Sequence, residues 1–207
     1  MQPRQIAREL AVLSMSQMPA NPEKLATQQL STMILAVVRT LSEEAQESLE
    51  QASNELKQSN EYVLQNEINP QKQVNPKTNL SQAIELTKNA INRVGMSIKI
   101  PEFIYLSNQQ EVKSYALEII RITQKNRQEI DDLINSVLTD GNISRFGKID
   151  RDILRVAVAE IRYLGLPEKV AINEAVEISK RYSVIEGYKL INGILRKVTD
   201  YLKSVNN

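Results

Sequence analysis

The sequence predicts an all-α protein, a bundle of about seven helices, and three observations support this prediction. Apolar residues recur at spacings of three and four along most of the 207-residue chain, which is the period of one helix face. Only 6 Gly and 7 Pro occur, fewer than the turns of a β-rich domain of this size normally need. Aromatic residues, which favour strands, make up 4% of the chain.

The first two helices have recognisable boundaries. Pro3 suits the first turn of a helix because it lacks a backbone N–H, and this helix is expected to end at Met18. Residues 21–23 read Asn-Pro-Glu, a capping residue followed by a proline and an acid, which predicts the next helix start. Apolar residues then continue at helical spacing over residues 30–56, so we expect one long helix that reaches into an acidic stretch.

The middle of the chain is more polar. Two Asn-Pro pairs between residues 69 and 76 predict a loop. Asn79 and Gln82 resemble a capping box, and the helix that they open is expected to close at Gly95. Residues 98–101 read Ile-Lys-Ile-Pro, which we interpret as an extended connector.

The C-terminal half again shows strong helical periodicity. Residues 109–138 predict one long helix, or two with a break near Asn126, and residues 139–142 predict a loop. Three further helices are expected: one ended by Gly165, one closing near Tyr182, and a last one that carries the remaining apolar positions.

The composition weighs against an enzyme. The chain has no Cys, His or Trp, which excludes thiol nucleophiles, Cys/His metal sites, disulfides and a histidine base. The acidic pairs Asp131/Asp132 and Asp150/Asp152 are best explained as surface and helix-start charge, and no phosphate-binding glycine loop occurs. We therefore expect no catalysis, no metal and no cofactor.

Charge is unevenly distributed although the formal net charge is only +1. Residues 42–67 carry seven glutamates against one lysine, a local charge of −6, whereas residues 143–207 carry twelve basic and eight acidic residues, a local charge of +4. Local patches decide nucleic-acid binding, so the sum does not exclude it. The apolar runs are too short for a bilayer and the N-terminus lacks a signal peptide, so a cytoplasmic protein is expected.

Three motifs follow one another in the C-terminal part. Residues 150–157 read Asp-Arg-x-Ile-Leu-Arg-Val-Ala, residues 169–175 read Lys-Val-Ala-Ile-Asn-Glu-Ala, and residues 189–197 read Lys-Leu-Ile-Asn-Gly-Ile-Leu-x-Lys. Together they closely resemble the signature of the NusB family of transcription antitermination proteins. The opening helix, with Arg4 and Arg8, is similar to the family's first helix.

The resemblance implies a fold and a set of partners. It implies a single helical domain over residues 1–207, built of two packed subbundles, that binds RNA without catalysis. It also implies a heterodimer with NusE, a small-subunit ribosomal protein, which binds the single-stranded boxA element of ribosomal RNA leaders. That complex acts on the RNA polymerase elongation complex so that rRNA transcription is completed.

The RNA contacts expected from this resemblance are mostly cationic. Arg4 and Arg8 would reach phosphates, and Arg151, Arg155 and Lys189 would extend the track. Tyr188 is the expected base stacker and Glu186 would accept a hydrogen bond from a base amino group. Other roles stay open for two of the seven: Arg155 as part of a buried ion pair, and Tyr188 as a cap of the last helix.

The sequence departs from the family both at expected contact positions and in its length. Its opening helix has fewer arginines, and Leu190 stands where members often carry Phe. We therefore expect RNA binding to depend more strongly on the NusE partner. The chain is also longer than typical members around residues 41–79, an acidic insertion that we expect to point away from RNA because negative charge repels phosphates.

The sequence also allows two alternatives to the RNA-binding factor. One is a protein-only helical adaptor of the transcription or ribosome-assembly machinery with little RNA affinity. The other is the RNA-binding appendage of an rRNA cytosine methyltransferase, which is disfavoured because the chain has no Cys nucleophile and no α/β cofactor-binding domain.

Overall fold

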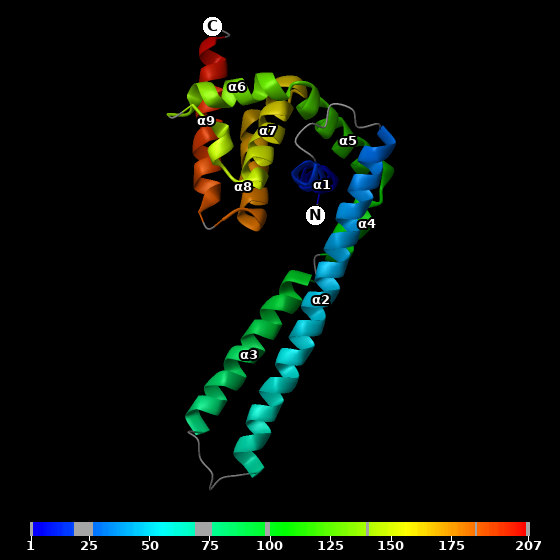
Figure 1. The fold of residues 1–207 in the computed structure, drawn as a ribbon, viewed down its shortest axis with the longest axis vertical. Helices are drawn as coiled ribbons and strands as arrows, with labels where there is room; N and C mark the ends of the chain where they lie inside the picture. Colours follow the sequence, from blue (N-terminus) through cyan, green and yellow to red (C-terminus); the bar gives the residue numbers. More distant parts are fainter. Residues whose placement is uncertain are drawn as a thin grey trace. The chain divides into compact units, whose positions relative to one another are not determined.

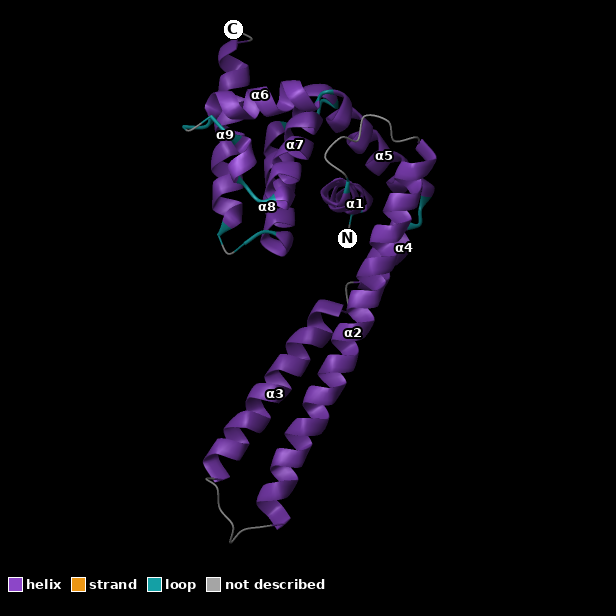
Figure 2. Cartoon of the chain, in the orientation of Figure 1, coloured by secondary structure: helices purple, strands orange, loops and turns teal. Residues whose placement is uncertain are grey.

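A computed structural model describes residues 2–18, 27–68, 76–97, 100–139, 141–184 and 186–205. Every regular element in these ranges is helical and none is a strand, which confirms the all-α prediction (Figure 2). The helices of this described part are α1 (Pro3–Gln17), α2 (Thr27–Ile68), α3 (Pro76–Ser97), α4 (Ile100–Ser107), α5 (Gln110–Lys125), α6 (Arg127–Val137), the short 3₁₀ helix η1 (Ile143–Arg145), α7 (Lys148–Tyr163), α8 (Glu168–Tyr182) and α9 (Gly187–Val205).

The chain divides into two compact units. The first comprises Met1–Val37 together with Leu106–Asn207, and the second comprises Val38–Tyr105. The acidic stretch at residues 41–79 lies within the second unit.

The first unit is assembled around α7. This helix packs against α1, α5, α6, α8 and α9, and its residues from Asp152 to Glu160 are all buried. Figure 1 shows α7, α8 and α9 alongside one another with α6 across them, while α1 is seen end-on. The apolar positions of the C-terminal motifs therefore form this core, with Ile153, Leu154, Ile191 and Leu195 almost fully buried.

The second unit is built on a helical hairpin. The helices α2 and α3 run side by side (Figure 1), and small side chains such as Ala52, Ala83 and Ala90 are buried. The helices approach so closely that the Ser59 hydroxyl donates to the backbone carbonyl of Ala83 at 2.9 Å. An ion pair between Arg93 and Glu55 at 3.1 Å adds a second link. Small residues make this approach possible because they leave no bulk between the two backbones.

Several predicted boundaries agree with the structure. Helix α1 covers the predicted first helix, and residues 109–138 form two helices, α5 and α6, with the break at Asn126. There the Asn126 side chain donates to the carbonyl of Ile122, the last turn of α5, at 2.9 Å. The predicted start at residues 21–23 and the loop over residues 69–75 lie outside the described residues.

Three predictions near the hairpin are wrong. Helix α3 begins at Pro76 rather than at Asn79, because proline is favoured in the first helical turn. The helix continues through Gly95 to Ser97, since Gly95 does not take the left-handed conformation that ends helices. Ile100 and Pro101 open α4 instead of forming an extended connector, because a proline is tolerated in the first turn.

Candidate nucleic-acid interface

Arg8 lies inside the first unit. Only 4% of the residue is exposed, and its Nε donates to both carboxylate oxygens of Glu160 on α7 at 2.8 Å. Glu174 on α8 lies 3.6 Å from the same guanidinium. The hydroxyl of Tyr115 on α5 donates to Glu160 Oε1 at 2.6 Å. Arg8 therefore joins four helices and offers no free charge to a phosphate on the surface.

Ionisation of this cluster is shifted by its burial. Burial, and then the hydrogen bond to Glu160, raise the pKa of Tyr115 to about 12. Burial also raises the pKa of Glu174, against the opposing charge of Arg8. Burial alone would lower the pKa of Arg8, but the negative charge of Glu160 outweighs it and the pKa is raised. The Arg8 guanidinium therefore stays charged inside the fold.

Arg155 is also used within the fold. Its Nε and Nη2 donate to the two oxygens of Asp131 at 2.7 and 2.8 Å, and its Nη1 donates to Asp152 at 2.9 Å. The Asp131 contact ties α7 to α6 in a bidentate ion pair. Burial raises the pKa of Asp152, and the hydrogen bond and positive charge of Arg155 offset only part of this increase. Of the two roles left open for Arg155 by the sequence, this placement matches the buried ion pair.

Arg4 is exposed but has acidic neighbours. Its guanidinium lies 5.4 Å from the centre of the Tyr115 ring, a cation–π arrangement. The shallow pocket beside it, of about 260 Å³, is also lined by Glu111 and Glu118 of α5. These carboxylates reduce the positive potential that Arg4 can present to a phosphate.

Arg151 is partly exposed in the first turn of α7. Its Nε is buried and has no hydrogen-bond partner among the described residues, so one of its donors remains to be satisfied.

The turn between α8 and α9 brings the three other predicted residues together. Glu186 takes a left-handed backbone conformation, with φ of +69°, and its carboxylate pairs with Lys189 in the first turn of α9. The Lys189 side chain is 59% exposed. Tyr188 is partly buried, with the ammonium of Lys180 5.9 Å from its ring centre.

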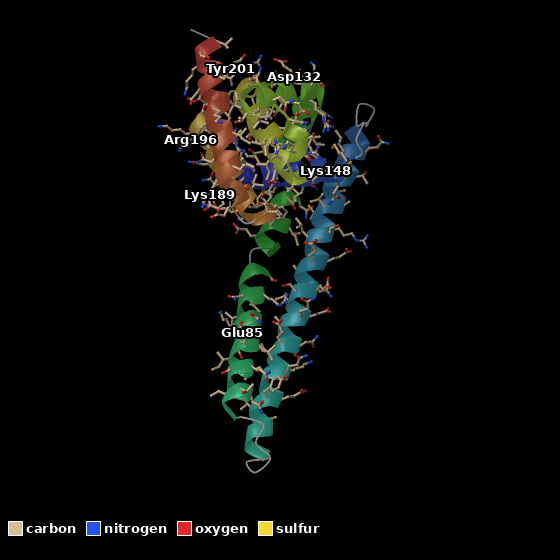
Figure 3. The ribbon with its side chains drawn as sticks, turned by 60° about the vertical axis from the view of Figure 1, so that its left-hand side comes forward. Glu85, Asp132, Lys148, Lys189, Arg196 and Tyr201 are labelled. Atoms are coloured by element: carbon tan, nitrogen blue, oxygen red, sulfur yellow. The ribbon has the colours of Figure 1, made fainter. Side chains whose placement is uncertain are left out.

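Lys189 also lines an open groove of about 490 Å³, which we call the α9 groove. One wall is α9, along which Lys189 and Arg196 follow one another in Figure 3. The opposite wall is the segment that leads through η1. The groove is lined by Leu138, Thr139, Asn142, Arg145, Phe146, Lys189, Leu190, Gly193, Ile194 and Lys197.

The chemistry of the α9 groove differs from that around Arg4. Among the described residues, its lining includes the cations Arg145, Lys189 and Lys197 and no carboxylate, alongside the apolar surface of Phe146 and Leu190. Sequence reasoning missed Arg145 and Lys197 as site residues. Lys197 ends the third motif and so carried a signal, whereas Arg145 precedes the first motif and carried none.

The seven predicted residues thus do not form one continuous track. Arg4 and Arg8 meet at the Tyr115 ring, on a helix that packs against α5 and α7. Glu186, Tyr188 and Lys189 lie at the start of α9, which packs against α6, α7 and α8.

The described ranges hold neither a metal-binding cluster nor a membrane-spanning helix. No group of acidic side chains there could hold a metal ion. No helix in these ranges combines the length and the apolar character needed to cross a bilayer.

The first unit is thus a helical bundle with an internal arginine–carboxylate network and a cation-lined surface groove. Comparison with known proteins identifies which bundle this is. The family model described as "NusB family" matches residues 79–200. The chain belongs to the NusB family.

Its relatives align over nearly the whole chain. The Transcription antitermination protein NusB of Gloeothece citriformis is 50% identical, covering 98% of this chain and 96% of its own. That of Microcystis aeruginosa is 51% identical, covering 97% and 93%. Similarity to the solved T. maritima NusB is weak, with 23% identity and a TM-score of 0.43 over 72% of this chain and 90% of that chain.

Proposed function

We propose that this protein is a transcription antitermination factor that binds RNA together with a protein partner, without a catalytic step. Two observations support the proposal: the relatives that align over nearly the whole chain carry the name Transcription antitermination protein NusB, and the α9 groove collects cations next to apolar surface. The finer proposal is that the RNA is the single-stranded boxA element of ribosomal RNA leaders and that the partner is NusE. The complex then acts in the cytoplasm on the RNA polymerase elongation complex.

The α9 groove suits a single strand better than a duplex. Lys189, Lys197 and Arg145 supply charge for the sugar–phosphate backbone, while Phe146 and Leu190 supply apolar surface for unstacked bases. An aromatic ring under a base contributes roughly 1–3 kcal/mol. Tyr188 would stack at the groove's end, and Glu186 would accept a hydrogen bond from a base amino group. The cationic groove is the observation that carries this proposal.

The predicted residues then take different roles. Lys189 contacts phosphate directly, and Arg4 and Arg151 add weaker contacts away from the groove. Arg8 and Arg155 act from inside the fold, where they hold α1 and α6 against α7.

The test is a titration of labelled boxA-like RNA by fluorescence anisotropy, with and without NusE and at several salt concentrations. We expect boxA to bind more tightly than a scrambled RNA of equal length, and NusE to increase that preference. Each neutralised phosphate should contribute about −0.7 to the slope of log affinity against log salt. Equal, weak binding of both RNAs in both conditions would contradict the proposal.

The protein-only adaptor is the second candidate. It is favoured by the internal placement of Arg8 and Arg155 and by the acidic neighbours of Arg4, which leave fewer cations for RNA. Pull-down of NusE together with the absence of salt-dependent RNA binding would support this candidate.

A further inference from the structure

Helix α9 contains two glycines, and packing explains only one of them. Gly187 is buried, and a Cβ added there would lie 2.0 Å from the Ser183 Oγ. Gly193 is exposed, its φ is not positive, and apart from its chain neighbours and the helix backbone no heavy atom of the described residues lies within 4 Å of an added Cβ. Glycine destabilises a helix interior relative to alanine, so Gly193 costs stability without serving the packing of the described fold.

The open space at Gly193 belongs to the α9 groove. Gly193 lies three residues after Leu190 and four before Lys197, a spacing that places the three on one face of α9. All three line the groove, whose volume of about 490 Å³ lies in the range of small-ligand sites. The missing side chain therefore leaves a gap in the α9 wall, which we call the Gly193 gap.

Apolar and cationic groups surround the Gly193 gap. Leu190 is 47% exposed, and Phe146 is partly exposed on the opposite wall of the groove. Arg145 and Lys197, which also line the groove, are exposed cations. The face of an unstacked nucleobase packs on apolar and aromatic side chains, whereas the sugar–phosphate backbone is held by cations. The lining thus offers partners for both parts of a nucleotide.

We propose that the Gly193 gap holds one unstacked nucleobase of a bound single strand. This inference rests on the RNA-binding function proposed above and adds to it the place of a base. The base lies against the α9 backbone at Gly193, between Leu190 and Phe146, and the phosphates beside it approach Arg145 and Lys197. A phosphate is a poorer occupant of the gap itself, because the two apolar side chains would shield its charge from water without donating hydrogen bonds.

The test fills the gap without removing a charge. Gly193→Met introduces a long side chain that is compatible with a helix. In the anisotropy titration of boxA-like RNA with NusE present, we expect this variant to bind roughly tenfold more weakly or worse. The slope of log affinity against log salt should stay the same because every cation remains. Gly193→Ala fills less of the gap and should weaken binding less. Unaltered affinity of Gly193→Met would overturn the proposal.

Gly95→Met is the matched control variant. Gly95 is also an exposed helical glycine, on α3, and no heavy atom of the described residues lies within 4 Å of its added Cβ. Urea denaturation should show that neither methionine variant is less stable than the natural protein, and the control should bind RNA as the natural protein does. Equal weakening of RNA binding in both variants would overturn the proposal. A loss of stability confined to Gly193→Met would contradict an open gap and so overturn it as well.

RNAs with a single abasic nucleotide separate a base from a phosphate in the gap. At one position the missing base should weaken binding by the natural protein, and Gly193→Met should bind that RNA as tightly as the natural protein does, because no base is left to exclude. Equal weakening by Gly193→Met at every abasic position would place the backbone in the gap and overturn the proposal. Failure of the natural protein to prefer boxA-like RNA over scrambled RNA would instead contradict the proposed function, and this inference with it.

Discussion

Arg8 and Glu160 lie 152 positions apart in the chain and form a buried ion pair in which the Arg8 Nε is 2.8 Å from both carboxylate oxygens. The pair joins α1 to α7, and Tyr115 adds a hydrogen bond from α5. Two charges removed from water are tolerated here because each has partners of good geometry. Arg8, one of the arginines predicted from the sequence to reach phosphates, is therefore part of the core.

We expect Arg8→Met to destabilise the protein strongly. The substitution keeps much of the side-chain volume but leaves Glu160 buried without its cation, which costs about 3–5 kcal/mol in comparable cases. The free energy of unfolding, measured by urea denaturation with circular dichroism, reports this loss.

Arg4→Ala is the matched control for that experiment. Arg4 is exposed on the same helix, so its removal should change the free energy of unfolding by only about 0.5 kcal/mol or less. If the two variants were equally stable, the Arg8–Glu160 pair would have no structural role.

Tyr115→Phe should alter stability in a pH-dependent way. The pKa of Tyr115 is raised from 10.0 to about 12, so the folded protein holds this proton more tightly than the unfolded chain does. The resulting stabilisation is complete below pH 10 and is lost as the pH rises from 10 to 12. Because the ring is partly exposed, we expect only roughly 1–2 kcal/mol from this effect.

Ultraviolet titration of the tyrosines provides the measurement. The natural protein has 7 Tyr, and the variant should lack the one that ionises near pH 12. Urea denaturation should then show a steeper loss of stability above pH 10 in the natural protein than in Tyr115→Phe. Parallel curves would show that the hydrogen bond to Glu160 does not hold the proton.

Most of the fold could be predicted from local sequence signals, because the helices of the first unit are amphipathic and bounded by recognisable residues. The break at Asn126 is one example, and the end of α7 before Gly165, which takes a left-handed conformation, is another. Helix α4 was missed because residues 98–101, a short apolar run ended by a proline, are typical of an extended connector. The proline lies in a helical first turn instead, which no local pattern reveals.

The site was less predictable, because a residue's charge does not reveal its burial. Arg4 and Arg8 both belong to α1, yet only Arg8 binds Glu160. That glutamate lies on α7, 152 positions further along the chain. Likewise Arg145 lines the α9 groove only because the segment through η1 folds back beside α9. Such relationships depend on tertiary packing and not on spacing along the chain.

Lys189→Ala and Lys197→Ala should each weaken RNA binding through charge. Both residues line the α9 groove and are exposed, so each removal is expected to reduce the slope of log affinity against log salt by about 0.7 without loss of helix content. Lys169→Ala is the control, since Lys169 is exposed on α8 and does not line the groove. Identical slopes for all three variants would show that the RNA lies elsewhere.

Gly187→Ala should destabilise the turn that positions Lys189. Gly187 is buried, and a Cβ added there would lie 2.0 Å from the Oγ and 3.1 Å from the Cβ of Ser183. We expect a loss of roughly 1–3 kcal/mol from this overlap. The Ser183 Oγ is buried without a hydrogen-bond partner among the described residues, so Ser183→Ala alone should cost little.

The double variant separates steric overlap from other effects. Ser183→Ala removes the closest atom, so Gly187→Ala should cost less in that background than alone. Gly193→Ala is the control on the same helix: nothing lies within 4 Å of its added Cβ, and exchanging a helical glycine for alanine should stabilise the protein by about 0.5–1 kcal/mol. Strictly additive costs for Gly187→Ala and Ser183→Ala would mean that the overlap with Ser183 is not the cause. In that case the close approach at the α8–α9 turn would not be what fixes the position of Lys189.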